Sequence, residues 1–508
     1  MNNAITEKQR ATLSLATSLI SMGLHMVINF ILSPYIVENF GEEANGFAQL
    51  ASSFVNYATL LTVALNSMAS RFITVSYYQQ DYKTCGKYYS SVLIGNVFII
   101  LFLLFPSTFF VLSLERNLNI VTANVMHVKL LFAFVFLNFF VSLIQSVFGI
   151  AFYVKNALFI QNTVTSLYYV INALGLFIVF SLFTPSIYFI SMVALVCALF
   201  TTLCYAILKR KLMPDIVFSI KSFDIKAVGE MISSGVWNTI NQCGNLLMNG
   251  FDLLLANILI DPIQMGVLSV AKTLPNTIIQ LGTVVNTSFS PNLTIAYASG
   301  KKNEVLSSLR FSMKCSSFLM SIPLMVLVIF GLPFYSLWVP SMNAKQLSVL
   351  SILTCMTFIP FSGPQTLYNV YTTTNKLKLN SATVILGGIL NIGAVLVLLK
   401  FTNLGVYAVA GVSSCISILR NLLITVPYTA KLLGLKWYTF YKDVSISLLC
   451  CACVALVCVA VRYIMPTNSW LMLFIAVVVS CIISAASLFL ILLNKQEKHL
   501  IITKFKKI

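Results

Sequence analysis

The fold is decided by residues 231–297, which read MISSGVWNTINQCGNLLMNGFDLLLANILI (231–260), DPIQMG (261–266) and VLSVAKTLPNTIIQLGTVVNTSFSPNLTIAY (267–297). Two long apolar runs flank a short polar turn, and each can cross a bilayer, which takes about 20 residues at ~1.5 Å per residue. Asp252 lies well inside the first run and Lys272 well inside the second. In an antiparallel hairpin both lie at the same depth, roughly 15 Å from the turn. A charge at that depth is costly unless paired or hydrated. The two residues are therefore either a structural ion pair or the first candidates for a functional site.

The composition of the whole chain is that of an integral membrane protein. Of its 508 residues, 58% are hydrophobic and only 9% are charged, whereas soluble domains carry about 25% charged residues. The apolar runs have helical length and are not short alternating strands, which excludes a β-barrel. The first run continues to about residue 37 without a small-residue cleavage site. We therefore interpret it as a retained first helix and not as a signal peptide.

The sequence contains no motif of an enzyme or of a metal site. It has no glycine-rich phosphate loop, its three histidines are spread over the chain, and its twelve cysteines lack metal-ligand spacing. Cysteine within an apolar helix behaves as a small hydrophobe. We therefore expect no catalysis, no cofactor and no bound metal.

The apolar runs predict fourteen transmembrane helices. Their ranges are 12–37, 46–75, 88–113, 126–154, 157–182, 187–208, 231–260, 264–297, 308–335, 345–372, 379–400, 405–430, 444–464 and 470–493. Most of the 32 Lys and Arg residues fall in the connections on one side, which predicts that both termini are cytoplasmic. The net charge of +18 is thus a topology signal and a contact to anionic lipid. A nucleic-acid partner is the poorer interpretation.

An internal repeat at an offset of 220 residues relates the two halves of the chain. Equivalent pairs include Gly46 and Gly266, Asn29 and Asn249, and Gln145 and Gln365. The first six predicted helices fall on the next six. Because six is even, both halves start on the same side, so the repeat axis runs along the membrane normal.

The predicted fold is all-α, with two six-helix lobes and two further helices. The boundaries are 1–208 for the first lobe, 209–230 for a basic cytoplasmic linker, 231–430 for the second lobe, and 431–508 for helices 13 and 14 with a basic cytoplasmic tail. The end of the linker, IKSFDIKAVGEMI (220–232), is predicted to form an amphipathic surface helix.

A polar stripe runs down the first helix of the second lobe. Its members are Asn238, Asn241, Asn245, Asn249 and Asp252, at spacings that place them on one helical face. Lipid offers no hydrogen-bond partners, so the stripe faces other helices or water. It forms either interhelical hydrogen bonds, worth about 0.6–2 kcal/mol each, or the lining of a cavity. Its length favours a cavity, to which the next helix adds Lys272, Asn276 and Gln280.

The first two helices contribute three more candidates. Asn29 is the repeat equivalent of Asn249, so helices 1, 2, 7 and 8 are expected to surround one central space. His25 is either a satisfied interhelical histidine or a proton carrier. Arg71, at the end of helix 2, either extends to the interface or binds a phosphate, which its planar guanidinium suits.

Three segments resemble a known family of membrane proteins. The segment ENFGEEANGFAQLASSFVNYATLLTVALNSMASRFITVSYYQQDYKTCGKYYSS (38–91) resembles the start of Wzx-type lipid-linked oligosaccharide flippases. There a glycine turn leads into helix 2, which ends in an Ala-x-Arg-aromatic patch. GVWNTINQCGNLLMNGFDLLLANIL (235–259) is similar to the start of their second lobe. GPQTLYNVYTTTNKLKLNSATVILGGILNIGAVLVLLKFTNLGVYAVAG (363–411) is similar to their helices 10–12.

The resemblance, which covers most of 10–430, implies a transporter of the MATE–MurJ–oligosaccharide flippase (MOP) superfamily. Such a protein would move an undecaprenyl-diphosphate-linked oligosaccharide, of the capsule or O-antigen type, from the inner to the outer leaflet of a bacterial cytoplasmic membrane by alternating access. Its expected partners are membrane lipids and, in glycan assembly, a polysaccharide polymerase. Lys272 and Arg71 would attract the diphosphate, and Asn and Gln side chains suit sugar hydroxyls.

Three alternatives stay open. Two come from the same superfamily, a cation-coupled multidrug exporter of the MATE type and a lipid II flippase of the MurJ type. The first helix lacks the Asp expected of many such exporters and the arginines of MurJ-type proteins, which disfavours both. The third is a membrane-embedded assembly factor without transport. Lys272 is the leading site residue, because Asp252 and Lys272 fall on Leu32 and Ser52 under the repeat and so are an asymmetry of the second lobe.

Overall fold

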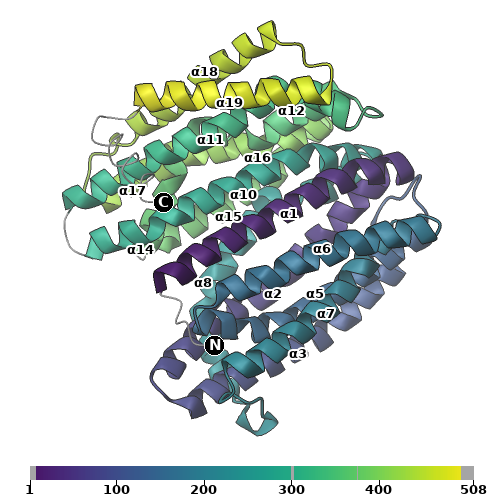
Figure 1. Cartoon of the computed structure of the whole chain (residues 1–508), viewed down its shortest axis with the longest axis vertical. Helices are drawn as coiled ribbons and strands as arrows, with labels where there is room; N and C mark the ends of the chain where they lie inside the picture. Colours follow the sequence, from purple (N-terminus) through teal and green to yellow (C-terminus); the bar gives the residue numbers. More distant parts are fainter. Residues whose placement is uncertain (1–6, 299–301, 375, 493–508) are drawn as a thin grey trace. The chain divides into compact units, whose positions relative to one another are not determined.

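A computed structural model describes residues 7–298, 302–374 and 376–492. In these ranges the regular structure is helical throughout and no strand occurs, which confirms the all-α fold (Figure 1). The basic tail predicted for 493–508 lies outside the described residues, as does Lys301 in the loop after helix 8.

The first half of the chain forms the six predicted helices and one additional turn. The elements are α1 (Glu7–Phe40), α2 (Glu42–Tyr78), α3 (Tyr82–Leu112), α4 (Leu114–Asn117), α5 (Val125–Val154), α6 (Leu158–Leu182) and α7 (Tyr188–Leu212). Side-chain caps set two of the starts. Asp81 accepts a hydrogen bond from the Thr84 amide (3.0 Å) at the start of α3. Asn124 accepts from the amides of Met126 (2.9 Å) and His127 (3.3 Å) at the start of α5.

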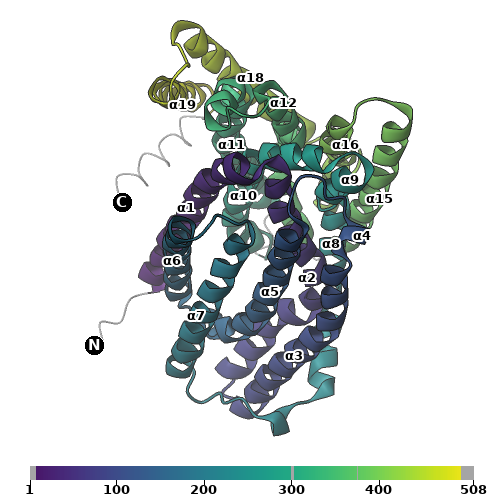
Figure 2. The same cartoon turned by 90° about the vertical axis from the view of Figure 1, so that its right-hand side faces the viewer.

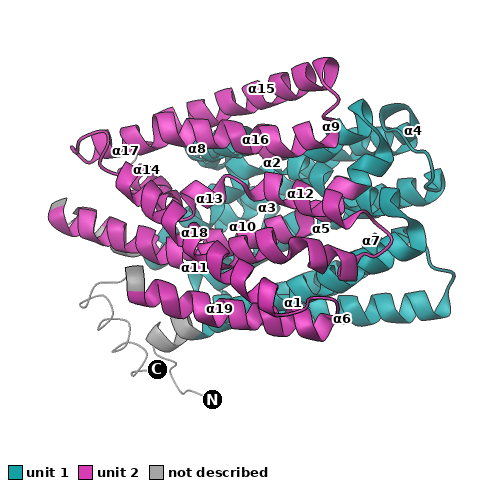
Figure 3. Ribbon diagram, turned by 90° about the horizontal axis from the view of Figure 1, so that it is seen from above, with its two compact units in different colours: residues 1–246, 250–266 teal, residues 247–249, 267–508 magenta. Residues whose placement is uncertain are grey.

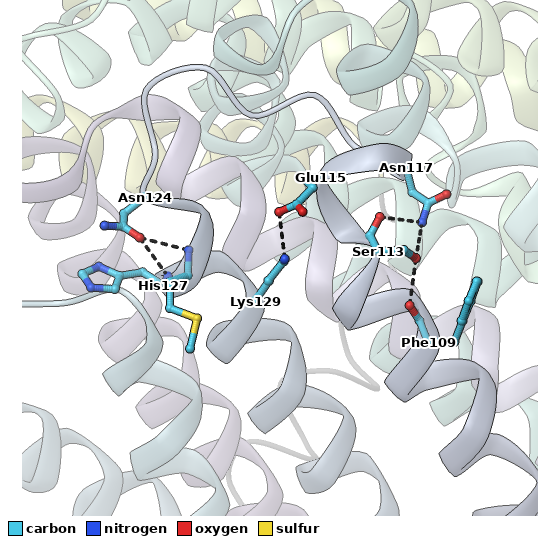
Figure 4. Close-up of polar contacts among 8 residues, drawn as sticks. Phe109, Ser113, Glu115, Asn117, Asn124, His127 and Lys129 are labelled. Atoms are coloured by element: carbon cyan, nitrogen blue, oxygen red, sulfur yellow. Dashed lines mark hydrogen bonds and ion pairs between the residues drawn. The ribbon is translucent and has the colours of Figure 1, made fainter.

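Polar contacts order the connection between α3 and α5 (Figure 4). Ser113 Oγ donates to the Phe109 carbonyl (2.8 Å), and Asn117 Nδ2 donates to Ser113 O and Oγ (both 3.0 Å). Glu115 of α4 forms an ion pair with Lys129 of α5 (2.7 Å). The short helix α4 is thereby tied to the first turns of α5.

The second half contains breaks that the sequence pattern does not predict. The elements are η1 (Ile220–Ser222), α8 (Ile225–Asn249), α9 (Asp252–Leu259), α10 (Pro262–Ala298), α11 (Lys302–Trp338), α12 (Ala344–Cys355), α13 (Phe358–Phe361), η2 (Pro364–Leu367), α14 (Tyr368–Thr373), α15 (Leu377–Phe401), α16 (Val406–Arg420), the π-helix η3 (Asn421–Thr425), α17 (Val426–Leu432), α18 (Tyr441–Ile464) and α19 (Trp470–Leu492).

Three predictions for this half were wrong in detail. The single helix predicted over 231–260 is broken between α8 and α9. The helix predicted over 345–372 is divided into α12, α13, η2 and α14. The linker does not end in a separate surface helix, because α8 begins at Ile225 and continues without interruption to Asn249. Breaks of this kind expose backbone groups, so they require partners from other elements.

Eleven helices within the described residues are long and apolar enough to cross a membrane by length and composition. The chain is therefore a multi-pass membrane protein. Three predicted spans are not among these eleven. They are 231–260 (α8 and α9), 264–297 (α10) and 345–372 (α12 to α14). The first two carry the polar stripe and Lys272, and the third is broken. Fourteen crossings stay a prediction.

Contacts divide the chain into two compact units (Figure 3). Unit 1 comprises residues 1–246 and 250–266, and unit 2 comprises 247–249 and 267–508. In unit 1, α5 lies between α3 and α7 (Figure 2). In unit 2, α11 packs against α18, and α18 against α19. The predicted lobe boundaries follow the repeat and not these contacts, so they stay a prediction.

Each unit has its own apolar core. The core of unit 1 includes Ile73 and Val147, and that of unit 2 includes Leu324 and Val454. Cys450, Cys451 and Cys458 pack in the same unit 2 core, as expected for cysteines that act as small hydrophobes.

Candidate functional site

The break between α8 and α9 is stabilised by a tyrosine of α2. The Tyr57 hydroxyl donates to the Gly250 carbonyl (2.6 Å). Its ring stacks on Phe251, with centroids 4.9 Å apart and an interplanar angle of 17°. The hydroxyl thus satisfies a carbonyl released where the helix is interrupted. An Asn-Gly pair is a local turn signal, so Asn249 and Gly250 could have indicated the break. No sequence signal points to Tyr57.

Asp252 is the first residue of α9 and is buried, with 4% of its surface exposed. A carboxylate at a helix N-terminus is stabilised by the helix dipole and by amides without intrahelical partners. The break therefore stabilises the Asp252 carboxylate, because it places the residue at a helix N-terminus; an unbroken helix would not. Asp252 belongs to unit 1 and Lys272 to unit 2. The predicted ion pair stays a prediction.

The polar stripe of α8 divides into satisfied and available side chains. Asn238 Nδ2 donates to Ser67 Oγ of α2 (3.1 Å), which is an interhelical hydrogen bond. Asn241 is partly buried, whereas Asn245 and Asn249 are exposed. The side chains of Asn245 and Asn249 make no hydrogen bond to the part of the chain that the structure describes. One end of the stripe thus acts in packing, and the other end is open to a ligand or to water.

α10 presents a similar open polar face. Asn276, Gln280, Thr283 and Thr287 are exposed and follow helical spacing. Neither Asn276 nor Gln280 forms a side-chain hydrogen bond with the described residues. A polar face without protein partners in a membrane helix requires hydration or a polar ligand. Lys272, one turn before Asn276, donates to the Asn249 carbonyl (3.5 Å) within unit 2.

The remaining candidates lie in unit 1. His25 Nε2 and Asn29 Nδ2 form a hydrogen bond along α1 (2.9 Å), and the His25 ring lies 5.0 Å from that of Tyr169 of α6. Both α1 side chains are thus engaged in packing. Arg71 is exposed near the end of α2 and has no hydrogen bond or ion pair with the described residues. It is available to an anion on that side.

The first turn of α2 is hydrogen-bonded to the loop before α5 by contacts that the sequence did not predict. Glu43 is buried and accepts from the amides of Val121 (2.8 Å), Thr122 (2.6 Å) and Ala123 (3.0 Å). The same loop is tied to α9, because Asn119 and Asn257 exchange side-chain to backbone hydrogen bonds of 3.0–3.1 Å. The loop before α5 therefore connects α2 to α9.

The repeat offset relates hydrogen bonds as well as residues. In unit 1, Asn66 of α2 and Asn96 of α3 pair through their amides (3.1 and 3.0 Å). Their equivalents under the offset of 220 are Asn286 and Ser316, which bond at 2.9 Å in unit 2. Equivalent contacts between equivalent helices are what a duplicated hairpin produces, so this observation is consistent with the predicted repeat.

Comparison with known proteins identifies the family. A family model described as "Polysaccharide biosynthesis protein" matches residues 13–296, which is more than half of the chain. The chain belongs to the polysaccharide biosynthesis protein family. A relative of this family member, the uncharacterized membrane protein EpsK of Bacillus subtilis (strain 168), is 26% identical over 501 residues and is matched over 98% of both chains.

Solved structures place this polysaccharide biosynthesis protein in the fold of the MOP superfamily. An inward-facing multidrug resistance MATE family transporter has a TM-score of 0.68 at 11% identity, over 84% of this chain and 98% of its own. The lipid II flippase MurJ, in an inward closed conformation, has a TM-score of 0.62 at 13% identity, over 94% and 99%. A MOP superfamily transporter from Pyrococcus furiosus has a TM-score of 0.62 at 12% identity, over 86% and 97%. Family and fold together support a flippase-type transport role.

Proposed function

We propose that the protein moves an undecaprenyl-diphosphate-linked oligosaccharide from the inner to the outer leaflet of a bacterial cytoplasmic membrane, with both termini cytoplasmic. The substrate combines a diphosphate with several sugars, and neither can enter about 30 Å of hydrocarbon without polar partners. The chain must therefore offer hydrogen-bonding side chains and positive charge along a membrane-spanning path.

The observation that carries the proposal is the open amide faces of α8 and α10. Asn245 and Asn249 of α8, and Asn276 and Gln280 of α10, are exposed and lack side-chain partners among the described residues. Each amide offers donors and an acceptor, which is the pattern that sugar hydroxyls require. Side chains that served only in helix packing would be hydrogen-bonded to neighbouring helices, as Asn238 is.

The positive charge of the route comes from Lys272 and Arg71. Lys272 lies one turn from Asn276 on α10, and its hydrogen bond to the Asn249 carbonyl is long, at 3.5 Å. A lysine ammonium binds phosphate oxygens as a compact positive charge, which suits a diphosphate. Arg71 would make the first contact, because it is exposed at the end of α2 that the charge distribution assigns to the cytoplasm. His25 and Asn29 would shape the wall of the route, Asn241 would extend its amide face, and Asp252 would be its acidic residue.

The two superfamily alternatives predict a different ligand. A MATE-type exporter would carry a small cationic compound against an ion gradient, and a MurJ-type flippase would carry lipid II. The MurJ structure matches 94% of this chain and the MATE structure 84%, and both share the fold of this chain, so the choice between them rests on the side chains of the route. An amide-lined, cationic route suits an anionic sugar lipid better than a cationic drug.

Reconstitution in liposomes tests the proposed function. The purified chain is inserted into vesicles whose inner or outer leaflet carries a polyprenyl-diphosphate-linked oligosaccharide with a fluorescent sugar. Loss of protection from a membrane-impermeant quencher reports translocation. Empty vesicles and vesicles with lipid II serve as references. Dye efflux driven by an ion gradient, without movement of the oligosaccharide lipid, would overturn the proposal in favour of the exporter.

A further inference from the structure

A second cationic centre lies in unit 2, where α16 ends in a π-helix. Arg420 is the last residue of α16 and is followed by η3, Asn421–Thr425. Single π-turns inside α-helices are rare and frequently mark functional sites. From the sequence, Arg420 is one of the basic residues that predict the cytoplasmic side, and no other role is predicted for it.

The contacts of Arg420 are all with neutral groups. Its Nη2 donates to the Tyr368 hydroxyl (2.5 Å) and to Asn421 Oδ1 (3.2 Å). The guanidinium carbon lies 5.7 Å from the centroid of the Tyr368 ring. Arg420 forms no ion pair with any residue that the structure describes. Its charge is half-buried, and no carboxylate of the described chain neutralises it.

One acceptor beside Arg420, Asn421 Oδ1, receives more hydrogen bonds than it has lone pairs. Asn421 Oδ1 accepts from three donors, namely Arg420, the Tyr368 hydroxyl (2.6 Å) and Thr425 Oγ1 (3.0 Å). A carbonyl oxygen has two lone pairs, and the Arg420 contact is the longest of the three. The guanidinium can therefore leave Asn421 without leaving that oxygen unsatisfied.

The guanidinium also has unused donors. Arg420 Nε is shielded from solvent and has no hydrogen-bond partner within 7–298, 302–374 and 376–492. Both hydrogen bonds that the side chain makes to these residues come from Nη2. Arginine carries five N–H donors in a planar fork that matches phosphate oxygens in bidentate fashion. An unneutralised arginine with free donors and a replaceable acceptor is chemically suited to an oxyanion.

We propose that Arg420, positioned by Tyr368 and Asn421, is a binding site for the phosphate ester of a lipid. This inference deepens the proposed function and rests on it in one respect, because the phosphate ester can be the diphosphate of the transported lipid. The same chemistry is present in an anionic phospholipid headgroup. Arg420 falls on Phe200 under the 220 offset, so the site, like Lys272, belongs to the second half alone.

Binding to the full chain in neutral phosphatidylcholine nanodiscs tests the site. The probes are a polyprenyl diphosphate without sugars, phosphatidylglycerol, and the uncharged polyprenol as a blank, each titrated and followed by native mass spectrometry. Arg420→Gln is expected to weaken phosphate-ester binding about 10- to 100-fold, the value of one charge-assisted hydrogen bond or two. Arg420→Lys keeps the charge without the fork and is expected to lose about 3- to 10-fold.

Two further variants guard against a general loss of structure. Arg210→Gln removes an exposed arginine at the end of α7 and is expected to bind all probes as the wild type does. Tyr368→Phe removes only the hydroxyl and is expected to stay within about threefold, because the guanidinium remains. The melting temperature of each variant is measured in the same nanodiscs.

The outcomes separate the sources and the two proposals. Weaker binding of the polyprenyl diphosphate alone supports a substrate site, and weaker binding of phosphatidylglycerol as well supports a headgroup site. Unchanged binding of both probes by a folded Arg420→Gln variant overturns the inference. If the wild type does not translocate the oligosaccharide lipid but loses phosphatidylglycerol through Arg420→Gln, the proposed function fails and the site stands. If the wild type translocates the oligosaccharide lipid and Arg420→Gln binds both probes like the wild type, the proposed function stands and the Arg420 site fails.

Discussion

Gly46 and Gly266 lie directly against each other, where α2 and α10 begin. A Cβ added to Gly46 would stand 3.0 Å from both Cα and N of Gly266. The two glycines are also equivalent under the offset of 220 residues. A residue can contact its own repeat equivalent only close to the repeat axis. Under the predicted repeat, the axis would pass between the first turns of α2 and α10 at this contact.

Gly266→Ala is expected to disrupt this contact more than Gly46→Ala. A Cβ on Gly266 would lie 2.2 Å from the Glu42 carbonyl oxygen, which is backbone, whereas the nearest atom to one on Gly46 is the mobile end of Met265 (2.6 Å). We expect a loss of about 1–3 kcal/mol in stability for Gly266→Ala, the usual cost of overpacking. Thermal unfolding in detergent measures this cost.

Gly393→Ala provides the control for the glycine variants. Nothing lies within 4 Å of a Cβ at Gly393, and alanine is the better helix former by about 1 kcal/mol. This variant is expected to be as stable as the wild type or slightly more so. Equal stability of the Gly266→Ala and Gly393→Ala variants would show that the contact of α2 with α10 is not tight in the membrane.

Asn286 is expected to contribute more to stability than its repeat equivalent Asn66. The Asn286 side chain accepts from Ser316 Oγ of α11 (2.9 Å) and donates to Gln365 Oε1 of η2 (3.0 Å), so it joins α10 to two other elements. Its backbone carbonyl accepts from Asn369 Nδ2 (2.9 Å), a bond that the leucine variant keeps. Within the described ranges the Asn66 side chain bonds with Asn96 alone, so it joins α2 to one other helix. At about 0.6–2 kcal/mol per interhelical bond, Asn286→Leu should lower the unfolding temperature clearly.

Asn276→Leu is the matched control, because Asn276 has no side-chain partner among the described residues. Its unfolding temperature should equal that of the wild type, whereas its transport should fall if the α10 amides bind sugars. A destabilised Asn276→Leu variant with normal transport would mean that the α10 face is a packing surface.

The helices could be predicted from the sequence, but the partners that stabilise their interruptions could not. Apolar runs and caps such as Asp81 and Asn124 are local signals, so each predicted range coincides with helical structure. At the break near Gly250, the donor to the Gly250 carbonyl is Tyr57, which lies 193 residues earlier. The π-helix at Asn421 accompanies contacts to Tyr368 of α14. Such long-range partners leave no periodic signal in a single sequence.

Only part of the candidate site could be predicted, because its long-range partners also leave no signal in the sequence. Helical spacing places Asn245 and Asn249 on one face correctly, because spacing within one helix is fixed. The sequence could not tell that Asn238 is hydrogen-bonded to Ser67 while those two stay open. Arg420 was interpreted as a topology signal only, since its neutral partners Tyr368 and Asn421 appear only once the helices are packed.

Lys272→Ala is expected to abolish translocation of the oligosaccharide lipid while the protein inserts at the wild-type level. Lys272→Arg keeps the charge and should retain part of the rate, because a guanidinium also binds a diphosphate. The quencher assay in liposomes gives both rates. Full activity of the alanine variant would remove Lys272 from the route and leave the amides of α8 and α10 as the remaining candidates.

Acid is expected to release the linker from α3. The Lys87 ammonium and the Lys226 backbone amide hold the pKa of Asp224 below its ordinary value of 3.8. A lowered carboxyl pKa stabilises the folded state above the ordinary value, and the contribution is lost as the pH falls through the folded-state pKa. Limited proteolysis of residues 213–224 should therefore be slow at pH 6 and faster near pH 3.

Asp224→Asn separates this contact from general acid unfolding. The amide cannot form the ion pair with Lys87, so cleavage of the linker in this variant should be fast already at pH 6 and depend little on pH. Ser91 still donates to the Asp224 carbonyl (3.4 Å) and accepts from its amide (3.0 Å), which should keep the rest of the linker in place. A variant with the pH dependence of the wild type would show that another group titrates.

Tyr57→Phe is expected to loosen the start of α9 without unfolding the protein. The variant keeps the ring that stacks on Phe251 but leaves the Gly250 carbonyl without its donor, which costs about 1–3 kcal/mol when the group is buried. Amide hydrogen exchange of residues 250–256 should therefore accelerate, while exchange in α5 stays slow. Tyr463→Phe, at a tyrosine that is 92% exposed, should leave both regions unchanged. Transport by Tyr57→Phe should fall together with the protection of α9 if the position of Asp252 matters for the route. Faster exchange with a normal transport rate would assign the tyrosine a purely structural role.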